Sequence, residues 1–447
     1  MESVMTYEEW AHTRVPGARD VEVVAIAGLG RGLRARKAFA RGDVVVEAAL
    51  GTCASLASAR ADEKLMRALE SVKASAEAVL AMHVLREVYD FHEASAYWPW
   101  LASLPRDVDS TAGWTEEELD ELEGSNVVAF TRAVKEEWRA EYDALNVTNL
   151  SLAYADVFGG EKAEYYTFER FTWAKYIVWS RAIDVRTGSE DGATARILVP
   201  ILDMANHSPL TKLVPELDAE RKTVRVYAAS DFAENVEIRF NYDAKPSQYF
   251  LLQYGFIPEN NPSECVEVTL RVAAGDPLRE AKEDLLKNHG LDPRTRNFEW
   301  KPVGIDVDLL AATRVIAMND DEINDPTSVA LAIAGASVSA RNDAHTKAVL
   351  LKSISSFLEG YKTTLREDTV YVRSRATNLP SKRKRFAVLL RMREKIILLS
   401  SANALFIELP DEDQELVIGA CRHAFYSEYD ACMSRANGSA FRKYERD

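Results

Sequence analysis

The stretch that decides the fold reads R-I-L-V-P-I-L-D-M-A-N-H-S-P at residues 196–209, and E-I-R-F-N-Y-D follows it at 237–243. Residues 197–201 form a short apolar run rich in branched side chains, which is typical of a buried strand. The run ends at 203–209, where Asp, Asn, Ser and Pro favour a turn, because their short side chains bond nearby backbone and proline fixes φ. Residues 236–242 alternate apolar with polar and predict a second short strand. A polar turn after one strand and a tyrosine at the end of another would frame a small pocket.

The length and charge of the chain limit the classes of partner. At 447 residues it is long enough for two or three domains with a sizeable core. It carries 55 Lys and Arg against 70 Asp and Glu, for a formal charge of −15. Such a surface is a poor generic binder of nucleic acid, whose affinity depends on neutralising phosphates. We therefore expect no nucleic-acid partner, and a basic or neutral protein partner, or solubility alone, fits the charge better.

The cysteines and the apolar runs indicate the compartment. The four cysteines are widely spaced with no C-x-x-C pair, which argues against a structural zinc site and a disulfide framework and suits a reducing compartment. They are Cys53, Cys265, Cys421 and Cys432. No apolar run reaches the ~20 residues that span a bilayer, and the acidic start resembles no targeting segment. We expect a cytoplasmic protein without a membrane partner; a plastid location would require a leader missing from this sequence, and a nuclear one is less favoured.

A glycine-rich segment follows the first strand signal, at residues 21–26. It reads G-L-G-R-G-L from Gly28, but it lacks the third glycine of a dinucleotide-binding loop at the required spacing, and no helix opens after it. Further strand signals at 33–35 and 44–47, with a turn between them, predict a β-meander instead. From the residues alone the segment is either a hairpin turn or a loop whose Gly30 lets backbone approach a ligand closely.

Helical periodicity dominates much of the remaining chain. The spacing of apolar residues predicts helices at 62–89 and 167–182, and Thr115-x-x-Glu118 is a capping box at a helix start. The apolar face of the 167–182 helix continues at Arg181. An arginine in a buried stripe needs an anion, which is any carboxylate on the pattern alone.

The C-terminal third shows strand-like residues at 266–272 and then helical stripes at 354–361 and 386–399, which alone predict a helical bundle. K-R-K-R at 382–385 is interpreted as a solvated helix start, with nuclear import as the less favoured alternative.

The motifs together resemble a known family. D-M-A-N-H-S, F-N-Y-D and the later Y-G-F are similar to the C-terminal half of a SET methyltransferase domain of the Rubisco large-subunit methyltransferase-like group. That group includes the aldolase lysine methyltransferases and the actin-histidine methyltransferase. The resemblance covers nearly the whole chain and implies an α+β fold, in which a β-rich SET domain split by a helical insert precedes an all-α substrate-binding domain. The implied boundaries are 1–60 and 176–272 for the two SET parts, 61–175 for the insert and 273–447 for the helical domain.

The resemblance also implies roles for single residues. The catalytic residue would be Tyr242, although a core tyrosine is the alternative from the residues alone. Asp203 could equally cap its turn, and His207 could be a surface or capping histidine. The implied S-adenosylmethionine-binding residues are Leu29, Gly30, Arg31, Arg181, Asp203, Asn206 and His207. The implied substrate-binding residues are Arg181, Asp203, Tyr242 and Tyr254, and no metal site is expected.

The implied function is transfer of a methyl group from S-adenosylmethionine to a lysine of a non-histone protein, docked by the helical domain of a monomeric enzyme. A lysine amine has pKa ~10.4, so the site must desolvate the ammonium, let its proton leave and aim the amine at the methyl group. Two rivals are a histidine methyltransferase of the same fold and an inactive scaffold. The histidine-methylating branch has tryptophan and asparagine where this chain has Leu202 and Ile183, which favours lysine. K-P-S-Q-Y at 245–249 replaces the S-N-A-E usual after the catalytic tyrosine, so the substrate stays open.

Overall fold

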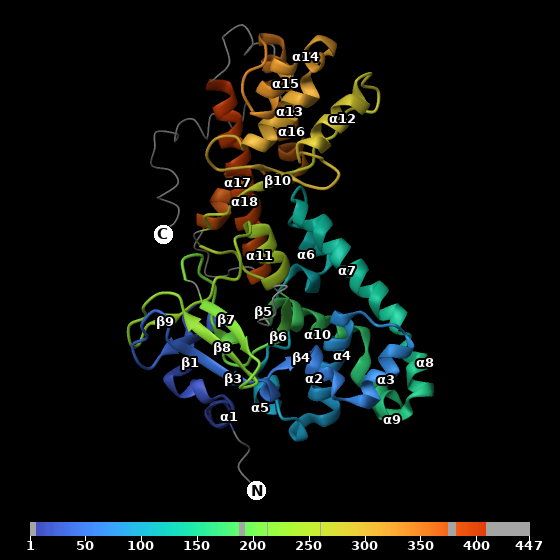
Figure 1. Ribbon diagram of the computed structural model, residues 1–447, viewed down its shortest axis with the longest axis vertical. Coiled ribbons are helices and arrows are strands. Elements are labelled where there is room, and N and C mark those ends of the chain that lie inside the picture. Colours follow the sequence, from blue (N-terminus) through green and yellow to red (C-terminus); the bar gives the residue numbers. More distant parts are fainter. Residues whose placement is uncertain (1–5, 187–192, 212, 260, 374–380, 408–447) are drawn as a thin grey trace. The chain divides into compact units, whose positions relative to one another are not determined.

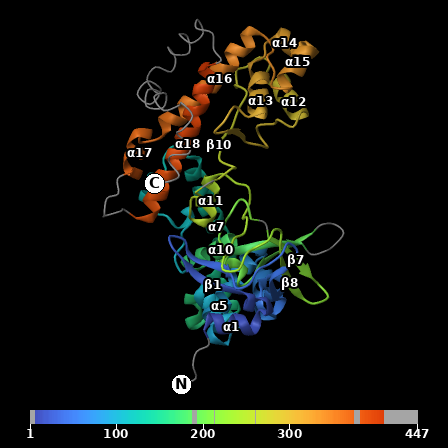
Figure 2. The same cartoon turned by 90° about the vertical axis from the view of Figure 1, so that its left-hand side faces the viewer.

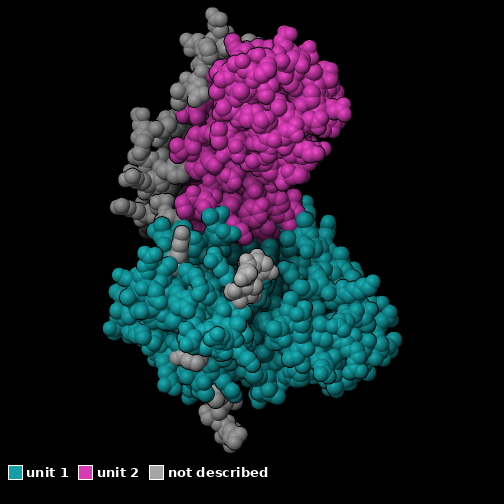
Figure 3. Space-filling view, in the orientation of Figure 1, with its two compact units in different colours: residues 1–113, 131–244, 253–255 teal, residues 114–130, 245–252, 256–447 magenta. Residues whose placement is uncertain are grey.

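The computed structural model describes residues 6–186, 193–211, 213–259, 261–373 and 381–407. These residues form two compact units (Figure 3). Unit 1 comprises 1–113, 131–244 and 253–255, and unit 2 comprises 114–130, 245–252 and 256–447. The domain boundaries expected from the sequence remain a prediction. Cys53 and Cys265 are buried and unpaired, whereas Cys421 and Cys432 lie outside the described residues.

Unit 1 contains two sheets. The smaller has the order β1-β2-β9 and the larger the order β3-β8-β7-β5-β6-β4 (Figure 1). The strands are β1 (Val21–Ile26), β2 (Gly30–Ala35), β3 (Val44–Ala49), β4 (Ala54–Ser55), β5 (Ala182–Arg186), β6 (Thr194–Leu198), β7 (Leu213–Asp218), β8 (Thr223–Ala228) and β9 (Glu237–Ile238).

The expected meander is only half right. The hairpin β1–β2 forms, with Val21 opposite Ala35, but β3 pairs with β8 and not with β2. The second edge of β2 is taken by β9, and at the turn before β3 the backbone N–H of Gly42 donates to the carbonyl of Ala228. The chain therefore leaves the first sheet at that turn and enters the second.

The helices of unit 1 stand beside these sheets (Figure 1). They include α1 (Tyr7–Arg14), α2 (Leu56–Arg60), α3 (Glu63–Ser71), α4 (Ala76–Leu85), α5 (Trp98–Ser103), α7 (Asn126–Leu145, whose first five residues belong to unit 2), α8 (Val147–Ala153), α9 (Ala155–Phe158) and α10 (Phe168–Arg181). The single helix expected at 62–89 is wrong. It is interrupted between α3 and α4, where Lys73 adopts a φ of +52° that a helix does not allow. The helix expected at 167–182 is confirmed as α10, with the side chain of Thr167 as its N-cap.

Unit 2 is mostly helical around its own apolar core (Figure 2). Its helices are α6 (Glu116–Asp120), α11 (Ser247–Tyr254, whose last two residues belong to unit 1), α12 (Arg279–Asn288), α13 (Val307–Ala317), α14 (Asp320–Asn324), α15 (Pro326–Ile333), α16 (Ala340–Gly360), α17 (Leu365–Arg373) and α18 (Lys382–Ile407). One antiparallel ribbon, β10 (Val266–Val268) with β11 (Phe298–Trp300), accompanies them, so the strand expected at 266–272 is shorter than predicted.

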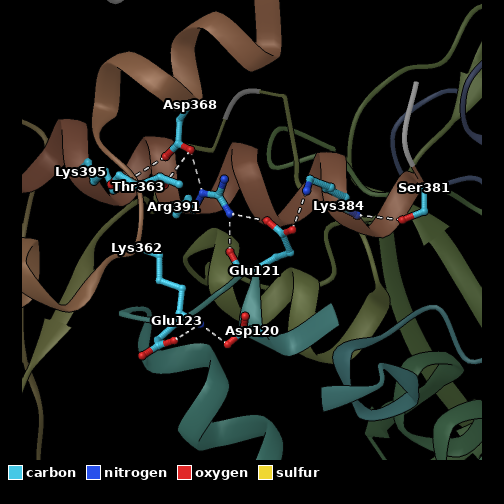
Figure 4. Close-up of polar contacts among 10 residues, drawn as sticks. All are labelled: Asp120, Glu121, Glu123, Lys362, Thr363, Asp368, Ser381, Lys384, Arg391 and Lys395. Atoms are coloured by element: carbon cyan, nitrogen blue, oxygen red, sulfur yellow. Dashed lines mark hydrogen bonds and ion pairs between the residues drawn. The ribbon is translucent and has the colours of Figure 1, made fainter. Parts of the chain in front are cut away.

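Charged side chains join α6 to the C-terminal helices of unit 2 (Figure 4). Asp368 on α17 accepts hydrogen bonds from Arg391 Nε at 2.8 Å and Lys395 Nζ at 2.9 Å, and Arg391 also pairs with Glu121 at 3.0 Å. K-R-K-R at 382–385 does begin a helix, but Lys384 pairs with Glu121, so this helix start is only partly solvated. The capping box at Thr115 is confirmed. Among the described helices, none combines the length and apolarity needed to cross a membrane.

Candidate active site

The candidate site begins where β6 ends. The strand stops at Leu198, earlier than the predicted 201, and a 3-10 turn, η7, spans Leu202–Met204. Ile201 between them is buried and has φ +74°, a conformation that branched residues rarely adopt. Backbone strain of this kind costs on the order of 1–3 kcal/mol and is concentrated at functional sites.

The strained turn places the carboxylate of Asp203 in a fully buried position against the end of α10. Arg181 Nη1 donates a hydrogen bond to the backbone carbonyl of Asp203 at 2.8 Å and lies 3.3 Å from the side-chain Oδ2 of Asp203. Trp100 Nε1 donates to that same Oδ2 at 3.1 Å. Burial raises the pKa of Asp203, and the guanidinium of Arg181 opposes that rise. Asp203 is therefore the anion that the sequence predicts for Arg181. Arg181 Nε and Asp203 Oδ1 are also buried, and each has no hydrogen-bond partner among the described residues.

The amide of Asn206 joins this turn to the glycine-rich hairpin. Its Nδ2 donates to the carbonyl of Arg31 at 3.2 Å and to Glu237 Oε1 at 2.9 Å. Gly32 faces the same amide, because a Cβ added there would lie 2.8 Å from Asn206 Nδ2. Two segments about 175 residues apart in the sequence thus meet at a position where no side chain fits.

His207 and Tyr242 come together through backbone pairing of their segments. Phe240 N donates to the Asn206 carbonyl at 2.8 Å, and Ser208 N donates to the Phe240 carbonyl at 3.1 Å. The strand predicted at 236–242 is wrong in extent, since only Glu237–Ile238 is strand, and a single bridge joins His207 to Phe240. Tyr242 N donates to His207 Nδ1 at 3.2 Å, which requires that ring nitrogen to be unprotonated. Burial, with the nearby charge of Arg239, lowers the pKa of His207 to about 4, so the ring stays neutral.

Two tyrosines face each other beside this corner. The rings of Tyr242 and Tyr254 lie 4.8 Å apart between centroids, and Tyr242 Oη donates to the Ala205 carbonyl at 2.8 Å. Burial raises the pKa of Tyr254 to about 12 and that of Tyr242 further, so both hydroxyls keep their protons near neutral pH. Gly255 holds the position of Tyr254, because its φ is +77° and a Cβ there would meet the backbone of Asp109 at 2.5 Å.

The structure thus brings together most of the residues singled out from the sequence. They are Arg31 through its carbonyl, Arg181, Asp203, Asn206, His207, Tyr242 and Tyr254. Leu29 is 53% exposed and Gly30, with φ +84°, has open space around its Cα; neither makes a described side-chain contact with this group. Their predicted roles rest on the resemblance alone.

Two residues of this group were missed by the sequence analysis. Trp100, which the sequence did not single out, donates a hydrogen bond from its Nε1 to Asp203 Oδ2. Tyr7 on α1 has a buried hydroxyl that lies close to the Ile201 backbone. Its pKa is raised first by burial and then by the nearby Asp203 carboxylate. Nothing in the sequence pattern signals either contact, because both partners lie far away in the chain.

Comparison with known proteins gives this arrangement its family. The SET domain model matches residues 30–243, and the model described as Rubisco LSMT substrate-binding matches residues 273–398. The chain carries a SET domain followed by a Rubisco LSMT substrate-binding domain. The SET match begins at Gly30, within the glycine-rich hairpin, and contains the Asn206–His207 corner and Tyr242, so the resemblance drawn from the motifs is confirmed.

Curated relatives of this SET protein include two kinds of methyltransferase. The chloroplastic [fructose-bisphosphate aldolase]-lysine N-methyltransferase of Arabidopsis thaliana is 26% identical over 64% of this chain and 59% of its own length. The actin-histidine N-methyltransferase of Canis lupus familiaris is 23% identical over 87% of this chain and 67% of its own length. The chain thus spans about three fifths of the plant relative and two thirds of the animal one.

Solved structures confirm the predicted fold class. The SET domain of LSMT bound to lysine and AdoHcy matches with a TM-score of 0.71 at 21% identity, covering 99% of this chain and 98% of that chain. Rubisco LSMT bound to sinefungin and monomethyllysine matches with the same TM-score at 22% identity, covering 100% and 99%. The SET domain and the helical domain therefore occur here in the arrangement expected along the chain.

Proposed function

We propose that this SET protein is an S-adenosylmethionine-dependent protein-lysine N-methyltransferase that acts on a non-histone protein. The observation that carries the proposal is the convergence of Tyr242, Tyr254 and the Asn206–His207 corner on the glycine-rich hairpin within one unit. The relatives that methylate aldolase lysine and actin histidine support protein methylation as the reaction class.

The residues present suit the cofactor. Arg181 Nε is a buried cationic donor without a partner among the described residues, as a bound carboxylate requires. The open space around Gly30, which has a positive φ, leaves backbone accessible to a ligand. We assign Leu29, Gly30, Arg31, Asn206 and His207, with Arg181 and Asp203, to cofactor binding. The cofactor, when bound, supplies an electrophilic methyl group on a sulfonium.

Side chains of this protein would bind and orient the amine of the substrate lysine. The tyrosine rings of Tyr242 and Tyr254 offer π-faces, which attract an ammonium or methylammonium group by about 0.5–2 kcal/mol. Both hydroxyls are neutral near pH 7, so they orient an amine by hydrogen bonding without fixing it as an ammonium. The adjacent carboxylate of Asp203, which is fully buried, and the partly buried guanidinium of Arg181 set the local field.

A lysine target is favoured over histidine by two positions. Leu202 is buried beside Asp203, and Ile183 on β5 pairs with Ile197, so neither offers a polar group to an imidazole. Histidine methylation remains the second candidate because the actin-histidine relative aligns with more of this chain than the plant lysine enzyme does. Acid hydrolysis of a methylated product and amino-acid analysis separate methyllysine from methylhistidine.

The remaining parts of the proposal concern the partner and the setting. We propose that the Rubisco LSMT substrate-binding domain docks a protein substrate, and that the enzyme is a cytoplasmic monomer without nucleic-acid or membrane partners. The net charge of −15 supports the absence of a nucleic-acid partner.

The decisive experiment is Tyr242→Phe with Tyr142→Phe as matched control. Each change deletes one hydroxyl that donates to a backbone carbonyl, of Ala205 in the first case and of Tyr166 in the second. Each purified variant is incubated with labelled S-adenosylmethionine and extract from the source cells, and the methylated protein band is identified by mass spectrometry. We expect Tyr242→Phe to lower methyl transfer by about 100-fold or more, with cofactor affinity unchanged by calorimetry, and Tyr142→Phe to retain activity.

Normal transfer by Tyr242→Phe would show that this hydroxyl has no catalytic role. Cofactor binding without any transfer by the unmodified protein would instead indicate the inactive scaffold.

A further inference from the structure

Unit 2 contains a hollow of about 360 Å³ that the proposed chemistry does not use. It lies between the segment after β10, the start of α12, the end of α13 and one face of α16. Its lining residues are Arg271, Ala273, Asp276, Lys282, Ile316, Ala317, Met318, Arg341, His345, Val349 and Lys352. Four of these side chains are cationic and one is a carboxylate, so the lining carries a net charge of +3 with His345 neutral. In a chain with a net charge of −15, this is a local reversal of sign.

The face of α16 accounts for much of the positive charge. Arg341, His345, Val349 and Lys352 follow one another at intervals of four, four and three residues, which places them on one side of a helix. All four line the hollow. This stripe gives no signal in the apolar periodicity of the sequence, because Val349 is its one apolar residue.

Part of the charge has a structural use, and part does not. Lys282 donates to Asp276 at 2.7 Å and to the Ile316 carbonyl at 2.9 Å, and Arg341 donates to the Ala317 carbonyl, so these two cations cap the end of α13. Arg271, His345 and Lys352 have no hydrogen bond or ion pair from their side chains within the part of the chain that the structure describes. Arg271 and Lys352 are exposed. Two exposed cations, Arg271 and Lys352, therefore stand at the hollow without a side-chain partner among the described residues.

We propose that this hollow binds an acidic segment of the protein substrate, an inference that rests on the proposed function. Arg271 and Lys352 would pair with aspartate or glutamate side chains, while Ile316, Met318 and Val349 provide apolar surface for a residue between them. The hollow lies within the matched Rubisco LSMT substrate-binding domain except for Arg271, which precedes the match by two residues. An acidic peptide is favoured over a nucleic acid because the chain carries a net charge of −15, which would repel a long run of phosphates.

The test uses the full chain and a fluorescein-labelled oligo-glutamate peptide with a central leucine, measured by anisotropy without cofactor. The charge-reversed variant Arg271→Glu/Lys352→Glu is compared with Lys287→Glu/Arg385→Glu, which changes the same net charge at two exposed residues of unit 2 outside the hollow. We expect the first variant to weaken peptide binding at least about tenfold and the second to change it less than about twofold. Loss of binding at high salt should accompany this pattern, since the contacts are exposed ion pairs.

Three outcomes would overturn the inference. They are absence of peptide binding by the unmodified chain, equal weakening by both double variants, and tighter binding of an oligothymidylate than of the peptide. Peptide binding is measured without methyl transfer, so its failure is separate from failure of the proposed function. Once a substrate is identified, we expect Arg271→Glu/Lys352→Glu to raise its KM with little change in kcat, whereas a change in kcat alone would contradict a docking role.

Discussion

At the scale of single residues, the pair Arg181–Asp203 is the most consequential contact of the candidate site. The Asp203 side chain is 0% exposed and that of Arg181 is 21% exposed. Asp203→Ala would leave the guanidinium without its carboxylate in a partly buried position. We expect the free energy of unfolding to fall by about 3 kcal/mol, the lower end for a broken buried pair, because Arg181 keeps some access to water. Urea unfolding monitored by circular dichroism measures this change.

Double-mutant analysis distinguishes the ion pair from simple loss of packing. Arg181→Met/Asp203→Leu removes both charges, and we expect it to be more stable than Asp203→Ala by at least about 1 kcal/mol. Equal stability of the two variants would mean that the guanidinium left without Asp203 is not itself destabilising. Arg181→Met/Asp203→Leu should lose cofactor binding if Arg181 holds the cofactor as proposed, whereas Asp203→Ala retains the guanidinium.

The sequence predicted that Arg181 meets an anion, since an arginine in an apolar helical stripe has no other stable state. It could not identify that anion, because Asp203 reaches the helix end only through the strained conformation of Ile201. Tyr7 gives no sequence signal at all. A tyrosine in the first turn of an N-terminal helix is ordinary until the fold places it beside Asp203.

At the scale of elements, the hairpin β1–β2 and the Asn206 turn depend on one glycine. A Cβ at Gly32 would approach Ile26 Cγ1 to 2.7 Å and Asn206 Nδ2 to 2.8 Å. We therefore expect Gly32→Ala to displace the Asn206 amide and to weaken S-adenosylmethionine binding by about tenfold or more, measured by calorimetry.

The matched control for this change is Gly28→Ala in the same hairpin. Gly28 has φ +76° but nothing within 4 Å of an added Cβ. The control should therefore lose about 1–2 kcal/mol of stability through backbone strain and keep the Asn206 contacts. If both variants bind the cofactor equally, the hairpin does not contact it through Asn206.

The junction of α17 with α18 makes a second prediction at this scale (Figure 4). Asp368 and Lys395 are each 1% exposed, and Arg391 shares the same carboxylate. Asp368→Ala would leave two buried cations with one fewer anion, and we expect a loss of about 3–5 kcal/mol in thermal or urea unfolding. Asp120→Ala removes a fully exposed partner of Lys362, which retains Glu123, and should have no measurable effect. A small change in the free energy of unfolding for Asp368→Ala would show that water replaces the lost carboxylate as the partner of Arg391 and Lys395.

Elements were predictable where their signals are local. Thr115 and Thr167 mark helix starts because a capping side chain acts within one turn. Strand pairing was not predictable by the same means. The edge of β2 pairs with β9, about 200 residues later, and the short strand signal of β3 is equally compatible with pairing to β2 or β8. The packing of the whole unit determines which of these two strands β3 pairs with.

At the scale of the whole molecule, each unit contains a buried titratable group, and the two respond to pH with opposite sign. In unit 1, burial lowers the pKa of His83 from 6.5 to about 4, with the charges of Asp62 and Arg86 nearby. In unit 2, burial raises the pKa of Glu394 from 4.5 to about 7, and the nearby Glu264 carboxylate adds to the rise while Lys395 opposes it. Ser125 and Tyr361 donate to Glu394, and Ser58 Oγ lies 3.0 Å from His83 Nε2.

The unfolded chain protonates His83 below pH 6.5 while the folded unit keeps it neutral, so unit 1 loses stability as the pH falls from 6.5 to about 4. The folded unit 2 instead holds the Glu394 proton that the unfolded chain releases above pH 4.5, so unit 2 is most stable at low pH and loses that contribution as the pH rises to about 7. Each contribution to the free energy of unfolding is on the order of 3 kcal/mol, at about 1.4 kcal/mol per pKa unit.

Native-state hydrogen exchange, corrected for intrinsic rates, reports the stability of the two units separately. We expect His83→Gln to reduce the pH dependence of unit 1 alone without removing it, because His207 of the same unit has a pKa lowered to about 4 and contributes with the same sign. We expect Glu394→Gln to reduce the pH dependence of unit 2 alone. A common pH profile for both units in all three proteins would show that these groups do not control it.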